Sequence, residues 1–407
     1  MANDLLKVIA GVDTHADTHH VAIITEHGQH VADKEFLAVG SGYRKIFAFI
    51  TEFGPVLGVG IEGTGSYGAE LSRVLTREGL TVQEINRPNR QARRLRGKSD
   101  PLDAYQAAES VLAQRGTSTP KAKDGPVECL RVVRAARVSA MKARTIAVNQ
   151  IKGILVSAAE PLRSKYRGMS SVQLIPALEH SRPAGTLTDP EYATAVVLKN
   201  LATRYRNLDR EISQADDQLA EILAVHAPML CDLPGVGTEV ASQLLVTMGD
   251  NPERIGNEAQ FAALTGTAPI PASSGKTTRH RLSHGGDRAA NAAIHHVVVS
   301  RMATDQRTKD YVARRTEEGK SKKEIMRCLK RYVSRAIYGQ LTNPQPAPDI
   351  SDLRPTRQQL GLTLQTAARH FNTWPGTLSR IERGLSRDDA LAHEYRSWLA
   401  GQNPAEI

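Results

Sequence analysis

The sequence predicts an N-terminal α/β domain followed by three mainly helical segments. Short apolar runs of strand length alternate with helical patterns within residues 1–118. Apolar residues recur at helical spacing in residues 126–226 and 228–342. A Pro-rich linker at residues 343–348 then separates a small C-terminal segment, residues 350–407. The 407 residues are therefore enough for several domains, each with a core of its own.

The first segment opens with three strands in succession, and helices and strands alternate after them. The expected strands are Lys7–Val12, His20–Thr25, Val31–Val39, Leu57–Ile61 and Thr81–Ile85, and the expected helices are Tyr43–Phe53, Tyr67–Glu78 and Asp100–Gln114. A turn at residues 27–29 fits a hairpin between the second and third strands. This order is typical of a ribonuclease-H-like fold, whereas a Rossmann fold would open with a strand–helix–strand unit.

Composition narrows the class of partner. Lys and Arg number 53 against 43 Asp and Glu, a net charge of +10, which favours a polyanion. Hydrophobic residues at 40% exclude global disorder, and aromatic residues at 4% argue against broad base-stacking surfaces. We expect no membrane span, since no apolar run approaches about 18 residues. Three distant cysteines without a CxxC motif point to a reducing cytoplasm rather than to disulfides or structural zinc.

Residues 126–226 carry a heptad-like seam. Its members alternate spacings of four and three along one helix: Leu201, Tyr205, Leu208, Ile212, Ala215, Leu219 and Ile222. This pattern predicts a coiled coil or a helical hairpin, and packing within the chain and pairing with a second copy are both compatible with it. Two prolines and a glycine in residues 181–190 predict a turn between long helices.

The third segment begins with Leu-Pro-Gly-Val-Gly at residues 233–237, followed by an apolar helix at Glu239–Met248. This pattern resembles the turn of a helix-hairpin-helix motif, in which glycines let backbone amides approach a phosphate at a helix N-terminus. A plain interhelical turn is the alternative reading.

Four acids stand at positions that a compact α/β fold would bring together. Asp13 ends the first strand, Glu62 ends the fourth, and Asp100 and Asp103 are spaced to lie on one helix face. Clustered carboxylates repel one another unless a hard cation neutralises them. The pattern therefore predicts a Mg²⁺ or Mn²⁺ site that binds a scissile phosphate. Taken singly, Asp13 could be a turn residue and Asp100 a helix N-cap.

A cationic stretch without a single acid precedes this helix. We expect it to bind a phosphate backbone beside the metal site. Its members are Arg87, Arg90, Arg93, Arg94, Arg96 and Lys98.

Three motifs identify a family resemblance: Val12-Asp13, Ile-Glu-Gly-Thr-Gly-Ser-Tyr at residues 61–67, and Arg-x-Arg-Gly-Lys-Ser-Asp-x-x-Asp at residues 94–103. They resemble the DEDD transposases of one insertion-sequence family. The Leu-Pro-Gly-Val-Gly turn, Phe-Ala-Ala-Leu-Thr-Gly at residues 261–266 and Ala-Pro-Ile-Pro-Ala-Ser-Ser-Gly-Lys at residues 268–276 resemble that family's C-terminal transposase domain. The similarity runs in order over residues 6–342.

The resemblance implies a DNA recombinase guided by an element-encoded bridge RNA. A RuvC-like domain would hold Asp13, Glu62, Asp100 and Asp103 around Mg²⁺, and a transposase domain would supply a serine nucleophile. By its motif position that serine is Ser274, with Ser273 as the adjacent alternative. Target and donor DNA, the guide RNA and further copies of the chain, as a dimer or a tetramer, are the implied partners.

Cations near that serine could hold nucleic-acid phosphates. These are Lys276, Arg279 and Arg281, with His280 beside them. A second basic group between residues 314 and 335 could do the same or could be a solvated helix face.

The C-terminal segment looks like a helix-turn-helix of the Xre/Cro repressor type over residues 354–384. Thr363 would cap its second helix, Asn372 would take the left-handed turn position, and Pro375 would start the recognition helix. Thr377 and Arg380 would then face base edges or phosphates. A packing module without DNA binding is the alternative.

The expected function is thus DNA cutting and rejoining through a serine–DNA intermediate, in a cytoplasmic protein that associates with the bacterial nucleoid during the reaction. Two alternatives stay open: a RuvC-like endonuclease that uses water, and a non-catalytic DNA-binding regulator.

Overall fold

In the computed structural model the described residues are 6–85, 99–273, 280–344, 346, 349–384 and 388–402. They form two compact units. The first holds residues 1–125 together with 249–254, and the second holds residues 126–248 and 255–407. In the described part of the chain, no helix combines the length and the apolar character that crossing a membrane requires.

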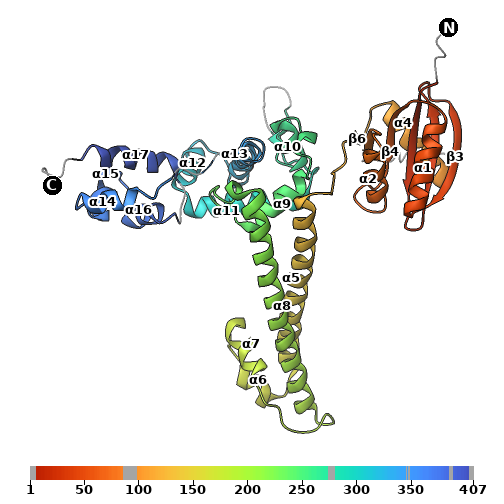
Figure 1. Ribbon diagram of the computed structural model, residues 1–407. Coiled ribbons are helices and arrows are strands. Elements are labelled where there is room, and N and C mark those ends of the chain that lie inside the picture. The colour runs from red at the N-terminus through yellow and green to blue at the C-terminus, as the bar shows by residue number, and fades with distance from the viewer. Residues whose placement is uncertain are drawn as a thin grey trace. The chain divides into compact units, whose positions relative to one another are not determined.

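A mixed six-stranded sheet organises the first unit, in the order β3-β2-β1-β4-β5-β6. The strands are β1 (Val8–Thr14), β2 (Thr18–Thr25), β3 (His30–Leu37), β4 (Val56–Ile61), β5 (Val82–Ile85) and β6 (Thr117–Ser118). The first three form an antiparallel meander, and β4 and β5 then add in parallel beside β1 (Figure 1). The five predicted strands are confirmed. The two-residue β6, antiparallel to β5, is too short to be predicted from a periodic pattern.

Helices cover both faces of this sheet. On one face α1 (Gly40–Glu52) and α2 (Ala69–Arg77) pack on Val8, Val12 and Val59. On the other face α4 (Asp100–Leu112) packs on Ile9 and Ile24. Because side chains alternate along a strand, β1, β2 and β5 contribute to two separate cores. The three predicted helices are confirmed to within a few residues.

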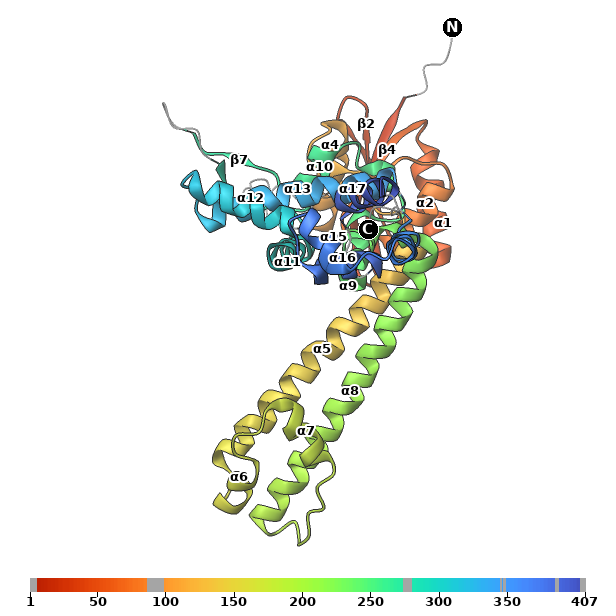
Figure 2. The ribbon, with the colours of Figure 1, turned by 90° about the vertical axis from the view of Figure 1, so that its left-hand side faces the viewer.

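A long antiparallel hairpin begins the second unit. Its arms are α5 (Pro126–Ser157) and α8 (Pro190–His226), and the short helices α6 (Glu160–Tyr166) and α7 (Ser171–Glu179) pack against one side of them at the far end (Figure 2). Every position of the predicted heptad seam is buried or half-buried, and Arg137 and Arg144 of α5 pair with Asp216 and Asp209 of α8. The seam therefore packs within the chain.

The hairpin base continues into a helical core. It comprises η1 (Pro228–Leu230), α9 (Thr238–Met248), α10 (Glu258–Leu264), α11 (Arg288–Thr304), α12 (Gln306–Glu317) and α13 (Lys322–Thr342). Leu219 and Leu223 of α8 share this core with Phe261 and Ile294. The predicted apolar helix after Gly237 is confirmed as α9, and Gly235 has the left-handed φ of +76° that a tight turn requires.

Four short helices form the C-terminal segment: α14 (Leu353–Gln359), α15 (Leu364–His370), α16 (Pro375–Glu382) and α17 (Asp389–Ala400). Three local predictions are confirmed. The Thr363 side chain accepts from the Thr366 amide, Asn372 has φ of +47°, and Pro375 is in the first turn of α16. Apolar residues from all four helices form one small core, including Leu353, Leu378 and Tyr395.

Candidate metal centre

The first carboxylate lies at the end of the central strand. Along β1 the side chains of Val8, Ala10 and Val12 enter the core beneath α1 and α2. Period-two alternation therefore places Gly11 and Asp13 on the opposite face, beneath α4. Asp13 is 6% exposed. Such burial is expensive for a carboxylate without a charge or hydrogen-bond partner.

Two glycines let α4 lie directly on the sheet. A Cβ atom on Gly11 would be 2.0 Å from the Ala104 carbonyl oxygen, and one on Gly60 would be 2.7 Å from the Ala107 carbonyl oxygen. Only a residue without a side chain fits at such distances. The strands thereby hold the helix at backbone contact, and the first turn of α4 is positioned at the ends of β1 and β4.

Asp100 and Asp103 both lie in that first turn. Asp103 is 1% exposed, whereas the Asp100 side chain is 44% exposed. Ser99, not Asp100, is the N-cap residue, and Pro101 follows in the first turn. The reading of Asp100 as an N-cap is therefore wrong. Helix N-termini favour negative charge, so both carboxylates are well placed for the helix as well as for a cation.

Glu62 follows β4, beside Asp13. Its amide donates to the Val12 carbonyl at 3.1 Å, and the Thr14 hydroxyl donates to the Glu62 carbonyl at 2.8 Å. These hydrogen bonds link the end of β4 to the end of β1. Gly63 then turns the chain with φ of +71°, so the Gly-rich loop leaves the sheet immediately after the carboxylate.

His15 is a member of the site that the sequence analysis missed. Its Nδ1 is 3.7 Å from Asp13 Oδ2, and its Nε2 is 3.8 Å from Asp100 Oδ1. One potential ligand atom from each of the three residues lies within 4.8 Å of the others. The Asp-x-His spacing at the end of a strand was the available signal, because it places both side chains on one face.

The donor set fits a divalent cation. Several carboxylates at one point repel one another, and an ion such as Mg²⁺ or Mn²⁺ would neutralise them. An imidazole adds a nitrogen ligand, which suits later transition metals better than Mg²⁺.

A second polar group ties α4 to the meander. Asp33 on β3 accepts from the Tyr105 hydroxyl at 3.2 Å and lies 2.7 Å from His20 Nε2. His30 stacks on the Tyr105 ring at 3.7 Å between centroids. Burial raises the pKa of Tyr105 to about 12, so the hydroxyl keeps its proton. These contacts fix the helix that carries Asp100 and Asp103.

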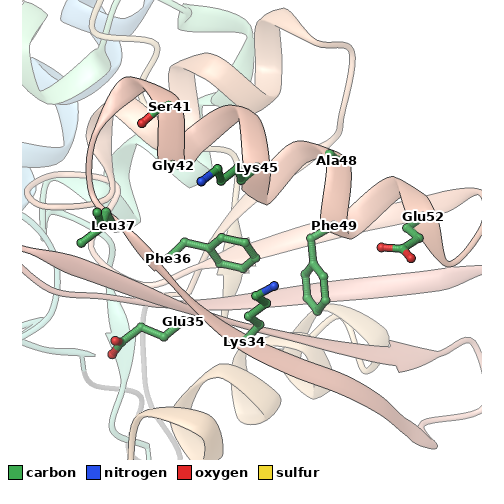
Figure 3. Close-up of a pocket in the computed structure, with 10 residues that line it drawn as sticks. All are labelled: Lys34, Glu35, Phe36, Leu37, Ser41, Gly42, Lys45, Ala48, Phe49 and Glu52. Carbon is green, nitrogen blue, oxygen red and sulfur yellow. The ribbon is translucent and has the colours of Figure 1, made fainter.

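A cavity of about 640 Å³ lies on the other face of the sheet, between β3 and α1. Figure 3 shows Phe36 and Phe49 at its centre, with Lys34 and Lys45 beside them. Its two acids, Glu35 and Glu52, balance the two lysines. It is thus separate from the carboxylates and has no excess of positive charge for a phosphate.

Several predicted residues lie outside the described part of the chain, so their placement stays a prediction. These are Arg87, Arg90, Arg93, Arg94, Arg96, Lys98, Ser274, Lys276 and Arg279. Ser273 is described and exposed. Next to this gap, His280 and Arg281 form the exposed strand β8, which pairs with Ile270–Pro271, β7. On α16, Thr377 is half-buried and Arg380 is exposed.

Two segments of the chain match known families. Residues 10–159 match a DEDD family associated with IS110 and described as Transposase. Residues 227–313 match a family described as Transposase IS116/IS110/IS902 family. The two matches follow the same order as the sequence motifs and together cover more than half of the chain.

Two curated proteins of Streptomyces coelicolor (strain ATCC BAA-471 / A3(2) / M145) are similar to the chain. An uncharacterized 43.6 kDa protein of insertion element IS110 is 27% identical over 149 residues, which is 36% of each chain. A protein named as a mini-circle transposase for IS117 is 22% identical over 329 residues, which is 68% of this chain and 80% of the relative. The first match thus spans about a third of that relative's length.

Proposed function

The chain belongs to the IS110 family of transposases, and from this premise we propose that it cuts and rejoins DNA to insert and excise a mobile element. The observation that carries the proposal is the meeting of Asp13, His15 and Asp100 within 4.8 Å, with Glu62 and Asp103 on the adjoining backbone. The strand order supports a ribonuclease-H-like, RuvC-like domain, because its meander and parallel strands place these residues at one edge.

The carboxylates would hold a divalent metal ion that binds the scissile phosphate. Asp13, Glu62, Asp100 and Asp103 are the proposed ligands of Mg²⁺ or Mn²⁺, which when bound would neutralise charge on the phosphate. The buried side chains of Asp13 and Asp103 supply fixed geometry, whereas the more exposed Asp100 and His15 lie on the side from which DNA would approach. The cations at residues 87–98 would hold the backbone on either side of the cut.

Ser274 is the proposed nucleophile. Its Oγ loses a proton to a base and forms a bond to phosphorus, while the bond from phosphorus to one DNA oxygen breaks and that oxygen takes up a proton. Attack by a DNA hydroxyl on the phosphoserine reverses these steps and releases the serine. The phosphodiester energy is thereby conserved, so strands can be exchanged without a nucleotide cofactor.

We further propose that an element-encoded bridge RNA selects the DNA sites. Base pairing by the RNA would read sequence, and the protein would hold backbones. The low aromatic content and the basic segments agree with such a division. Assembly into a dimer or a tetramer would bring the two domains of different copies together, with the α5–α8 hairpin as the assembly element. The helix-hairpin-helix turn at Gly235 would bind phosphate.

The covalent intermediate separates this function from its closest rival. A water-using endonuclease would cut DNA without an adduct. We expect a protein–DNA adduct, visible as a shifted band after denaturation, from the unchanged protein and from Ser273→Ala. The adduct should be absent from Ser274→Ala. An adduct that survives in Ser274→Ala and disappears in Ser273→Ala would move the nucleophile, and cleavage with no adduct would establish the water mechanism.

Sequencing of RNA that copurifies with the chain tests the guide. We expect reads from the flank of the element's own gene. Bulk cellular RNA without enrichment of that flank would contradict the bridge RNA while leaving the DNA chemistry intact.

The C-terminal segment is proposed to bind duplex DNA through α16. Thr377 and Arg380 lie on this helix, and Arg380 is exposed. The role would be to recognise element ends or to repress the element's own promoter. Binding that keeps its sequence preference after removal of residues 350–407 would contradict the proposal and favour a packing module.

A further inference from the structure

A second hollow, in the helical unit, is built from cations and tyrosines. This cavity of about 570 Å³ is lined by residues of α11, α12 and α13, the Leu233–Pro234 turn and the start of α17. Arg307, Tyr311 and Arg314 come from α12, and Tyr332 comes from α13. All of its lining residues belong to the second unit.

Two of the cavity's arginines have no acidic partner among the residues that the structure describes. Arg307 and Arg314 are exposed and make no salt bridge with any residue in the described ranges. Neighbouring cations differ, since Arg315 pairs with Glu318 and Arg331 pairs with Glu258. The cavity thus presents two guanidinium groups whose hydrogen-bond donors are available to an anion.

A third arginine has a structural task. Arg301 Nε donates to the Pro234 carbonyl at 2.7 Å, and burial lowers the pKa of Arg301. The bond holds the Leu-Pro-Gly-Val-Gly turn against α11, so one wall of the cavity is rigid.

The two tyrosines form an aromatic wall. Tyr311 and Tyr332 meet edge to face, with centroids 5.8 Å apart and an interplanar angle of 81°. Arg314 Cζ lies 5.5 Å from the Tyr311 centroid, and Tyr332 is 53% exposed. An exposed ring beside guanidinium groups is the combination that binds a base and its phosphate in single-stranded nucleic acids.

The C-terminal segment contributes the opposite charge. Asp388 and Asp389, at the start of α17, line the same cavity. Asp388 is the N-cap and accepts from the Leu391 amide at 3.1 Å. With Asp305, these two acids balance the three arginines of the lining. The two carboxylates thus lie on the same cavity lining as Arg307 and Arg314, where their charge would repel the phosphates of a bound strand.

We propose that this cavity binds a single-stranded segment of nucleic acid and that the acidic start of α17 competes with the strand for it. The inference rests on the proposed function only in that the ligand is a nucleic acid. It does not involve the carboxylate centre. The C-terminal segment would then reduce single-strand binding until it leaves the cavity.

The test uses the full chain with fluorescently labelled 12-nucleotide single strands of DNA and of RNA, in the presence of EDTA. Fluorescence anisotropy at several salt concentrations gives the affinity. Arg307→Gln with Arg314→Gln should weaken binding at least tenfold and lower the salt slope by about two. Arg315→Gln, on the same helix but paired with Glu318, is the matched control and should change binding less than about twofold.

The competition has its own variants. Asp388→Ser keeps a capping hydroxyl, and together with Asp389→Asn it should strengthen binding about tenfold. Tyr332→Leu should weaken binding about tenfold, whereas Tyr332→Phe should bind like the unchanged chain. Circular dichroism of each variant verifies folding. Unchanged binding in the double arginine variant, or unchanged binding in the double aspartate variant, overturns the proposal.

Comparison of the DNA and RNA oligonucleotides identifies the source of the ligand. Tighter binding of RNA identifies a guide strand, and tighter binding of DNA identifies a displaced DNA strand. Asp13→Asn separates this proposal from the function itself. That variant should lose strand transfer and keep single-strand binding. If it does so while the cavity variants bind single strands like the unchanged chain, the cavity proposal alone is overturned.

Discussion

The molecule has two groups of buried charged side chains, one in the C-terminal segment and one at the end of the sheet, and they differ in the side chains that surround them. In the C-terminal segment, Arg357 and Glu382 are 9% and 2% exposed at their side chains, and both Glu382 oxygens accept from the guanidinium, at 2.6 and 3.0 Å. The Tyr395 hydroxyl and the Leu362 carbonyl complete the network. At the end of the sheet, Asp13 and Asp103 are similarly buried, and potential ligand atoms of Asp13, His15 and Asp100 lie within 4.8 Å of one another.

This difference separates structure from function. Hydrogen bonding to Glu382 raises the pKa of Arg357, and burial raises the pKa of Tyr395, so the C-terminal network is neutral and complete without a ligand. The sheet edge instead brings Asp13 and Asp100 together with His15, and a divalent cation would reduce the repulsion between two such carboxylates. Burial alone therefore does not identify a functional site, whereas the kinds of side chain that meet there do.

The largest expected effect is on activity at the sheet edge. Asp13→Asn keeps the shape of the side chain and removes a ligand charge, so DNA strand transfer should fall at least about a thousandfold. The same change relieves repulsion among the carboxylates, so the melting temperature without metal should stay the same or rise. Strand-transfer assays and calorimetry measure the two quantities. Normal transfer in Asp13→Asn would make the metal mechanism wrong.

Breaking the C-terminal network should have the opposite effect, with the main loss in stability rather than in activity. Glu382→Gln leaves Arg357 buried without its partner and should cost about 3–5 kcal/mol of the free energy of unfolding of this segment. Hydrogen exchange of amides in α14–α17 measures the loss. Replacing the pair together, Arg357→Met with Glu382→Leu, should recover most of it, and the exposed Glu394→Gln is the control. Equal protection in Glu382→Gln and Glu394→Gln would mean that the network contributes little.

The contact between α4 and the sheet can be tested at a single atom. Gly11→Ala places a Cβ 2.0 Å from the Ala104 carbonyl oxygen, so α4 must move. We expect a loss of about 1–3 kcal/mol, together with lower strand transfer, because Asp100 and Asp103 move with the helix. Gly40→Ala is the control, since its Cβ would meet no atom within 4 Å. Denaturant unfolding compares the two, and equal stability would contradict the close contact.

Local rules predicted much of the fold from the sequence. Thr363, Asn372 and Pro375 each obey a backbone preference that acts within a few residues, so their positions could be predicted without knowledge of the tertiary structure. The strands of the first unit followed in the same way from periodicity. Whether the seam of α8 packs within the chain could not be predicted, because the residues of α5 and α8 that form salt bridges are 65 and 79 positions apart in sequence and both pairings satisfy the same spacing.

The site was predictable only in part. Asp13, Glu62, Asp100 and Asp103 stand out because each ends a strand or starts a helix. The glycines that bring them together do not, because the reason for Gly11 and Gly60 is the closeness of a helix 40 or more residues away. His15 was overlooked since a single histidine after a strand has many uses, and only the position of Asp100 relative to it gives the residue a role.

The smallest effect concerns the histidine that distinguishes this edge from a purely acidic one. His15→Ala removes the one nitrogen among the potential ligands described at the site. Because imidazole suits Co²⁺ better than Mg²⁺, the variant should bind Co²⁺ about tenfold more weakly, while Mg²⁺ binding should change less than about twofold. Visible absorbance of bound Co²⁺, and its displacement by Mg²⁺, report both affinities without reference to activity. The exposed His27→Ala is the control. An equal loss for both metals would instead give His15 the role of positioning Asp13 and Asp100, because a displaced carboxylate weakens every cation alike.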